Sequence, residues 1–179
     1  MILAEQKRNK NIAEYIIYVW QTEDLIRAYR FDRSAIQESI INFLPIDDQS
    51  KIETLAWYEQ LIKNMESEGL QKNGHLQVTK DVVAELEGLH HSLLEVVKDP
   101  AYIKIYEAAE SHIKSFQEIA KEQKLKETEV CLNGVYGLLL LRLDNKPVPE
   151  DLVQTIQRFG DVLSYLAYKY KEKKSGAWN

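Results

Sequence analysis

The chain has 179 residues, of which 45% are hydrophobic and 28% charged, as in an average folded globular protein. Its net charge of −5 argues against a nucleic-acid-binding domain, because phosphate binding needs a concentrated basic face. The opening residues reach charged side chains too early for a secretory signal, and no apolar run approaches about 18 residues, so we expect a cytoplasmic protein without a membrane span.

Helical spacing of apolar residues recurs along the whole chain, and strand-like alternation does not persist beyond a few residues. Proline and capping residues mark the boundaries. The clearest boundary is Lys98-Asp99-Pro100, because Asp99 can cap a helix and Pro100 suits its first position. The predicted helices span residues 3 or 11 to 29, 34–43, 49–68, 75–97, 100–123, a segment that ends near 144, and 149–170.

The sixth predicted helix is apolar nearly all round between Val135 and Leu143, which is typical of a helix surrounded by others. Gly134 and Gly137 lie three residues apart on it, where missing side chains allow close approach of another helix. Helices of about 20 residues are about 30 Å long, and short connections make neighbours antiparallel. We therefore predict an all-α fold, a single-domain antiparallel helical bundle of about six to seven helices over residues 1–179, with 171–179 as a candidate flexible tail.

Two stretches carry a family resemblance. The run QKRNKNIAEYIIYVWQTEDLIRAYRFD, from Gln6 to Asp32, is similar to the opening of the bacterial family of domain of unknown function 4924 (DUF4924). The run CLNGVYGLLLLRL, from Cys131 to Leu143, resembles a later helix of that family. Similar order and length extend the resemblance over nearly the whole chain. The family is all-helical and has no established activity, so the resemblance implies a fold and no site residues.

A carboxylate interrupts the apolar stripe of the first predicted helix, because Glu23 occupies a step where a core residue is expected. The rest of the stripe consists of Ile12, Ile16, Val19 and Ile26. Glu23 precedes Arg27 by four residues, so an ion pair between them is the simplest interpretation. The alternative is an internal polar pocket that recognises a small ligand, since aromatic residues are dense here. Its candidate residues are Tyr15, Trp20, Glu23 and Arg27.

Glu87 and His90 form an ExxH pair, whose spacing places both side chains on one helix face. With a carboxylate from another helix, this is the ligand pattern of di-iron and related metal bundles. That pattern needs two such pairs, and the sequence has no second one. A core-edge histidine that is hydrogen-bonded to its neighbour is the competing interpretation. A mononuclear site from His75, His90 or His112 with Glu23 also stays open, although no spacing favours it.

Motifs of catalysis are missing from the sequence, which has no GxSxG, no glycine-rich phosphate loop and no dinucleotide fingerprint. The single cysteine, Cys131, excludes an intrachain disulfide and a CxxC motif, and it has no histidine nearby in sequence. We therefore assign no catalytic residue and no cofactor.

Ten tyrosines are present, and tyrosine is enriched at interfaces. Together with the missing catalytic motifs and the mildly acidic charge, they favour a non-enzymatic helical protein that acts through protein contacts, as a homo-oligomer or with another protein. The alternative is a ligand- or metal-binding bundle, in one version an enzyme, that uses Glu23, Glu87 and His90. Trp178 near the C-terminus either docks on the domain or a sister subunit, or stays in solvent, and the sequence does not choose between these.

Overall fold

Every regular element of the computed structural model is helical within the residues that it describes, 3–121 and 123–176. This confirms the all-α prediction. The elements are α1 (Leu3–Lys10), α2 (Ile12–Ala28), α3 (Arg33–Ser39), η1 (Ile41–Phe43), α4 (Asp48–Ser67), α5 (Gln77–His91), η2 (Ser92–Val96), α6 (Pro100–Ile119), α7 (Glu127–Leu143) and α8 (Glu150–Lys174). The chain forms two compact units, residues 1–82 (unit 1) and 83–179 (unit 2), and α5 runs through the boundary.

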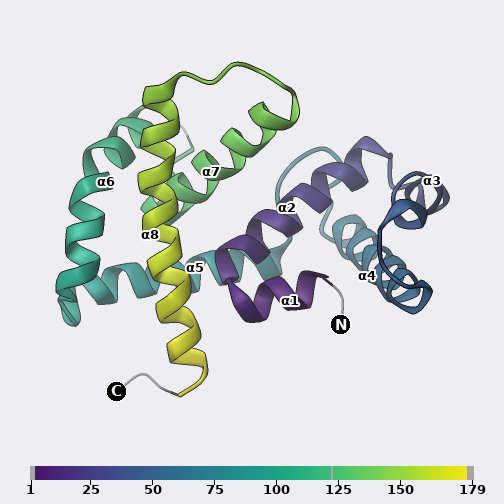
Figure 1. The fold of residues 1–179 in the computed structure, drawn as a ribbon, viewed down its shortest axis with the longest axis horizontal. Helices are drawn as coiled ribbons and strands as arrows, with labels where there is room; N and C mark the ends of the chain where they lie inside the picture. Colours follow the sequence, from purple (N-terminus) through teal and green to yellow (C-terminus); the bar gives the residue numbers. More distant parts are fainter. Residues whose placement is uncertain (1–2, 122, 177–179) are drawn as a thin grey trace. The chain divides into compact units, whose positions relative to one another are not determined.

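Unit 1 begins with two helices where the sequence allowed one. The side chain of Asn11 accepts hydrogen bonds from the amides of Ala13 and Glu14, at 3.0 and 3.2 Å, and so starts α2 anew. Asp32 and Asp47 cap α3 and α4 in the same way. In this unit α1 packs on α2, while α4 packs on α2, α3 and η1 (Figure 1). Fully buried side chains at its centre are Ile16, Ile26, Ile36, Ile41, Met65 and Leu76.

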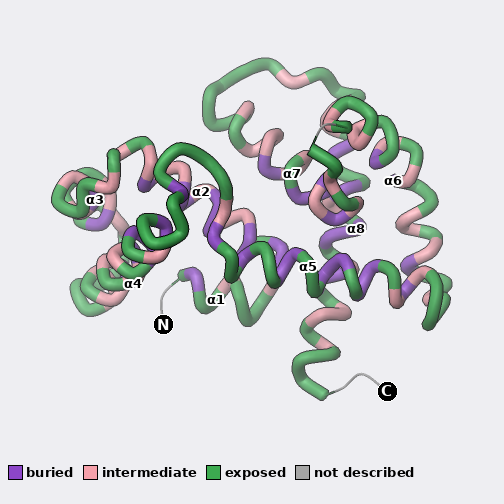
Figure 2. Tube along the Cα trace, turned by 180° about the vertical axis from the view of Figure 1, so that it is seen from behind, coloured by how far each residue is buried: buried purple, intermediate pink, exposed green. Residues whose placement is uncertain are grey.

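Unit 2 is built on α6, α7 and α8, which all pack against one another. Helices α6 and α8 run in opposite directions (Figure 1). Helix α5 continues into the π-helix η2, and Asp99 then caps α6, so the predicted boundary at Asp99-Pro100 is confirmed. The connection between α7 and α8 is mostly exposed (Figure 2).

Gly134 sets the contact between α7 and α8. A Cβ atom there would lie 2.7 Å from Cδ2 of Phe159 and 2.9 Å from Cδ1 of Ile156, closer than packed atoms come. The sequence interpretation of Gly134 as a point of close approach is therefore confirmed. Gly137 differs, because a Cβ atom there would meet nothing within 4 Å.

The prediction that other helices surround α7 is wrong for its C-terminal half. In this described stretch no valine or leucine from Val135 to Leu143 is buried, and Leu140 and Leu143 are 38% and 57% exposed. The apolar pattern indicates only that these side chains could be buried. In the structure, α6 and α8 cover part of the circumference of α7 and leave the rest exposed.

The C-terminal helix α8 continues to Lys174, into the segment considered as a tail. Trp178 lies outside the described residues. None of the described helices combines the length and the apolar character needed to span a lipid bilayer.

Candidate functional site

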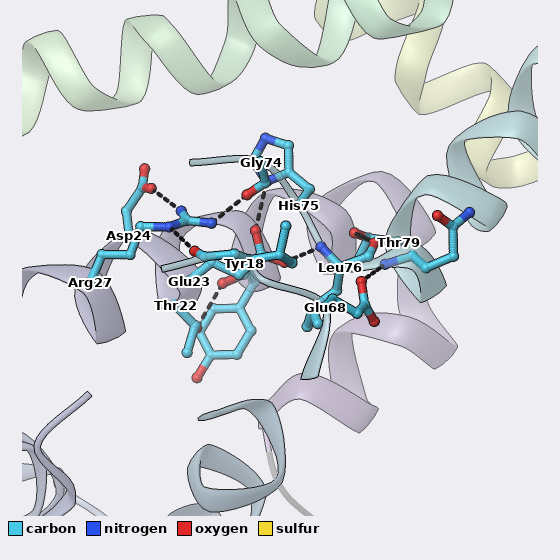
Figure 3. A network of polar contacts seen from close by, with 12 residues as sticks. Tyr18, Thr22, Glu23, Asp24, Arg27, Glu68, Gly74, His75, Leu76 and Thr79 are labelled. Atoms are coloured by element: carbon cyan, nitrogen blue, oxygen red, sulfur yellow. Dashed lines mark hydrogen bonds and ion pairs between the residues drawn. The ribbon is translucent and has the colours of Figure 1, made fainter. Parts of the chain in front are cut away.

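Glu23 is fully buried in unit 1, with none of its surface exposed. Its Oε2 lies 2.6 Å from Nδ1 of His75, and its Oε1 accepts a hydrogen bond from the amide of Leu76 at 3.0 Å (Figure 3). A carboxylate only accepts hydrogen bonds, and the tautomer of His75 that can donate to it is the one with the proton on Nδ1. The ring of Trp20 stacks on the His75 ring with centroids 4.2 Å apart.

Arg27 turns to the same connection between α4 and α5 (Figure 3). Its Nε donates to the carbonyl of Leu70 at 3.0 Å, its Nη2 donates to the carbonyl of Gly74, and its Nη1 pairs with Asp24 at 2.7 Å. The predicted Glu23–Arg27 ion pair is therefore wrong for these described residues. The connection offers carbonyls to Arg27 and an amide to Glu23, and the side chains of Asp24 and His75 complete the contacts of the two charged groups.

These contacts explain what the interrupted stripe of α2 does. Three of the four predicted ligand residues, Trp20, Glu23 and Arg27, hold the 70–76 connection against α2. The fourth, Tyr15, lies under the guanidinium of Arg8, 5.5 Å from its ring centre. Burial raises the pKa of Tyr15, Arg8 opposes the rise and Glu23 adds to it. The cluster fastens the 70–76 connection through the charged groups of Glu23 and Arg27.

His90 is the centre of a second buried network, in unit 2. Its Nδ1 lies 2.6 Å from the hydroxyl of Tyr102, and its Nε2 lies 3.0 Å from Oε2 of Glu127. The hydroxyl of Tyr106 donates to the other oxygen of Glu127 at 3.1 Å. The hydrogen bond from His90 lowers the pKa of Glu127, and burial raises the pKa of Tyr102. A proton on Nε2 then satisfies the whole chain, with the Tyr102 hydroxyl donating to Nδ1.

Glu87 and His90 both reach the first turn of α7, as their shared helix face requires. Oε2 of Glu87 accepts from the amide and the hydroxyl of Thr128, at 3.1 and 2.5 Å, and its Oε1 lies 3.2 Å from Nε2 of His91. Glu87 thus satisfies an amide at the N-terminus of α7, where a negative charge is favourable. The ExxH pair ties α5 to α7 through protein groups.

The metal hypothesis gains no support from this geometry. Within residues 3–121 and 123–176, no three His, Cys, Asp or Glu side chains are grouped so that they would hold a metal ion. Of the mononuclear candidates, His75 contacts Glu23, whereas His112 lies 3.3 Å from the hydroxyl of Thr155. Cys131 is fully buried and burial raises its pKa, so its thiol is a poor nucleophile.

Two grooves lie on the surface of unit 2. The first, here the α7 groove, joins cavities of about 480 and 320 Å³ that share Phe116, Asn133 and Gly134. Its other lining residues are Ile119, Ala120, Gln123, Leu125, Val130, Gly137, Leu138, Leu140, Leu141, Asp144, Lys146, Leu152 and Ile156.

The second, here the tyrosine groove, lies between α6 and α8 and has a volume of about 540 Å³. It is lined by Lys104, Ile105, Ala108, Arg158, Asp161, Ser164, Tyr165 and Tyr168.

Comparison with known proteins places the chain in a family. The profile of DUF4924, a domain of unknown function, matches residues 1–177. The chain belongs to this family. No curated protein and no solved structure matches it.

In this DUF4924 chain, sequence reasoning missed Glu127, which completes the His90 network, and named His75 beside Glu23 only as a candidate metal ligand. His75 is 52 positions from Glu23, and Glu127 is 37 positions from His90, so neither pairing has a local sequence signal. Both grooves were missed as well, because each is formed by helices that meet only in the folded unit.

Proposed function

We propose that this DUF4924 protein is a non-enzymatic helical protein of the cytoplasm that acts by self-association, with the α7 groove as the contact between two copies. The observation that carries the proposal is the uncovered apolar half of α7. Leu140 on the groove is 38% exposed, Leu143 beside it 57%, and Ile119 at the other end 83%. Contiguous apolar surface of this kind is typical of protein interfaces.

A second copy suits this groove because the shape of α7 is complementary to itself. Gly137 leaves a low point on the exposed face of α7, since nothing lies within 4 Å of a Cβ atom placed there. Leu140 stands one turn further along the same face. In a two-fold pairing of antiparallel α7 helices, the leucine of each copy meets the low point of the other.

The charges at the two ends of the groove favour the same antiparallel pairing. Lys121, Lys124 and Lys126 are exposed at one end. The acids of the neighbouring first turn of α7 are engaged internally, Glu127 by His90 and Glu129 by the amide of Lys126 at 2.8 Å. Among the described residues the three lysines outnumber the exposed Glu118 at this end, so its outward charge is positive.

The other end of the groove carries exposed acids. Glu150 and Asp151 are exposed at the start of α8. Asp144 is paired with Lys146 at 3.1 Å, and Arg142 is the remaining exposed cation. A two-fold axis near Gly137 brings the lysine end of one copy over the Glu150 and Asp151 end of the other, which supports a specific orientation.

The test measures the mass of the protein in solution by size-exclusion chromatography with light scattering. We expect the wild type to exceed the mass of one chain, and Leu140→Asp to have the mass of one chain with unchanged helical circular dichroism. Val96→Asp is the matched control, because Val96 is a 79% exposed aliphatic residue of unit 2 outside the groove. A one-chain mass for the wild type at its highest soluble concentration, or an equal effect of Val96→Asp, would overturn the proposal.

A further inference from the structure

The tyrosine groove combines an ordered aromatic wall with two cations, and it lies apart from the α7 groove in its lining residues. Its volume of about 540 Å³ is in the range of small-molecule sites. We propose that it binds a small aromatic molecule that carries an anionic group.

The aromatic wall is held in place by contacts of both tyrosine hydroxyls. Tyr165 donates to the carboxylate of Asp99 at 2.9 and 3.0 Å, and its ring stacks on the buried Tyr102 ring at 5.5 Å. Tyr168 donates to Glu172 at 2.6 Å and is 56% exposed, so its ring is accessible. Lys169 lies 5.7 and 5.5 Å from the two ring centres. The rings need little ordering when a flat ligand stacks on them.

The cations come from both walls of the groove. Nη1 of Arg158 on α8 donates to the carbonyl of Ala108 on α6 at 2.6 Å, which fixes the guanidinium at the edge of the groove. Lys104 lies one helical turn before Ala108 on α6 and is exposed. Among the described residues, neither cation has a carboxylate within ion-pair distance. An anionic group between them would form charge-assisted hydrogen bonds with both.

Asp161 is the only acid in the lining, so the groove keeps an excess of one positive charge on a chain whose net charge is −5. Its carboxylate provides an acceptor for an N–H or O–H group of the ligand. Ser164 adds a hydroxyl beside it. The lining therefore matches an anion, a hydrogen-bond donor and a flat ring, in one site.

The probe is anilinonaphthalene sulfonate, an aromatic anion whose fluorescence rises on binding, compared with phenylnaphthylamine, which lacks the sulfonate. We expect saturable binding of the sulfonate to the full-length protein. Lys104→Ala and Arg158→Ala should each weaken it about 10-fold and leave the neutral probe unaffected, because only the anion contacts the cations. Tyr168→Ala should weaken both probes. Lys104→Ala disturbs no hydrogen bond seen in the fold, so it tests the site even if Arg158→Ala alters the packing of α6 on α8.

Leu140→Asp is the control that separates the two grooves, since Leu140 lines only the α7 groove. We expect it to leave sulfonate binding unchanged. Three results would each overturn the proposal. The first is that the sulfonate does not bind saturably, and the second is that Lys104→Ala weakens the binding of both probes equally. The third is that Leu140→Asp abolishes sulfonate binding while Lys104→Ala and Arg158→Ala leave it unchanged. None of these outcomes depends on whether the protein self-associates.

Discussion

The Glu23 cluster of unit 1 and the His90 network of unit 2 contain the same contact, a carboxylate against an imidazole, with opposite burial. In unit 1 the carboxylate is inside, with a side-chain exposure of 0% against 30% for His75. In unit 2 the imidazole is inside, with 2% against 22% for Glu127. In each pair the buried group has a second hydrogen-bond partner in the fold, and in unit 2 the more exposed Glu127 has one as well, the hydroxyl of Tyr106. Leu76 binds the other oxygen of Glu23, and Tyr102 binds the other nitrogen of His90.

The two sites also differ in what they hold together. Glu23 fastens an irregular connection to α2, and its neighbour Arg27 completes the attachment through two carbonyls. His90 joins three helices, since it lies on α5 and contacts Tyr102 on α6 and Glu127 on α7. The comparison suggests that a buried carboxylate is the more costly group to disturb, and the following experiments rank the two sites.

Glu23→Ala should have the largest effect. It leaves the amide of Leu76 and the ring of His75 without their acceptor, and we expect a loss of about 3–5 kcal/mol in the free energy of unfolding. Urea unfolding followed by circular dichroism and tryptophan fluorescence measures it, because Trp20 and Trp57 lie in unit 1. Asp24→Ala is the control, since Asp24 is 47% exposed and its pairing should contribute less than about 1 kcal/mol. If Glu23→Ala and Asp24→Ala lower the free energy of unfolding equally, the buried carboxylate is no more important to stability than the exposed one.

His90→Phe should cost less, about 2–3 kcal/mol, because it leaves the Tyr102 hydroxyl and one oxygen of Glu127 without a partner, while Tyr106 still donates to the other oxygen. Adding Tyr102→Phe removes the stranded hydroxyl, so the second change should restore about 1 kcal/mol in this background although it destabilises the wild type. A double-mutant cycle from urea unfolding gives the coupling. Additive losses would mean that His90 and Tyr102 are not coupled through their hydrogen bond.

The smallest effect should be a pH dependence carried by Glu127. The hydrogen bond from His90 lowers the pKa of Glu127 below its ordinary value of 4.5. The folded state therefore binds this proton less readily than the unfolded state does. The resulting stabilisation is complete above the ordinary value and disappears as the pH falls through the lowered one.

Glu127→Gln should flatten the decline of the unfolding midpoint below about pH 4.5 relative to the wild type. Glu172→Gln provides the comparison. The pKa of Glu172 is also lowered, first by Tyr168, but at an exposed position where screening weakens the effect. If Glu127→Gln leaves the decline of the unfolding midpoint at low pH unchanged, the contact with His90 does not make the pKa of Glu127 differ between the folded and the unfolded state.

The fold was more predictable from sequence than the sites were. Asp99-Pro100 and the caps of α2 to α4 act within a few residues, so local chemistry predicts the helix boundaries. The same locality explains the error on Arg27. The rule for pairs four residues apart favoured Glu23 over Asp24, and the carbonyls that Arg27 binds belong to a connection far away in sequence. Periodicity did predict that Glu23 lies in the core, and this is confirmed, but His75 comes from another part of the chain.

The misreading of α7 has a different origin. Helical periodicity indicates which faces of a helix avoid water. Between Val135 and Leu143, α7 is apolar nearly all round, so the sequence does not indicate which face stays exposed. Which neighbours supply that contact is decided by the lengths and angles of α6 and α8. The local sequence therefore predicts that these residues are apolar and helical, but it does not indicate which other helices pack on them.

Gly134 has a consequence for how this surface can change. The residue belongs to the floor of both cavities of the α7 groove, and it is also the place where α7 rests on Phe159 and Ile156. A single added methyl group would at once make the depression shallower and wedge the two helices apart. The depth of the α7 groove and the packing of α7 on α8 therefore both depend on the absence of a side chain at this position. A substitution here cannot change one without changing the other.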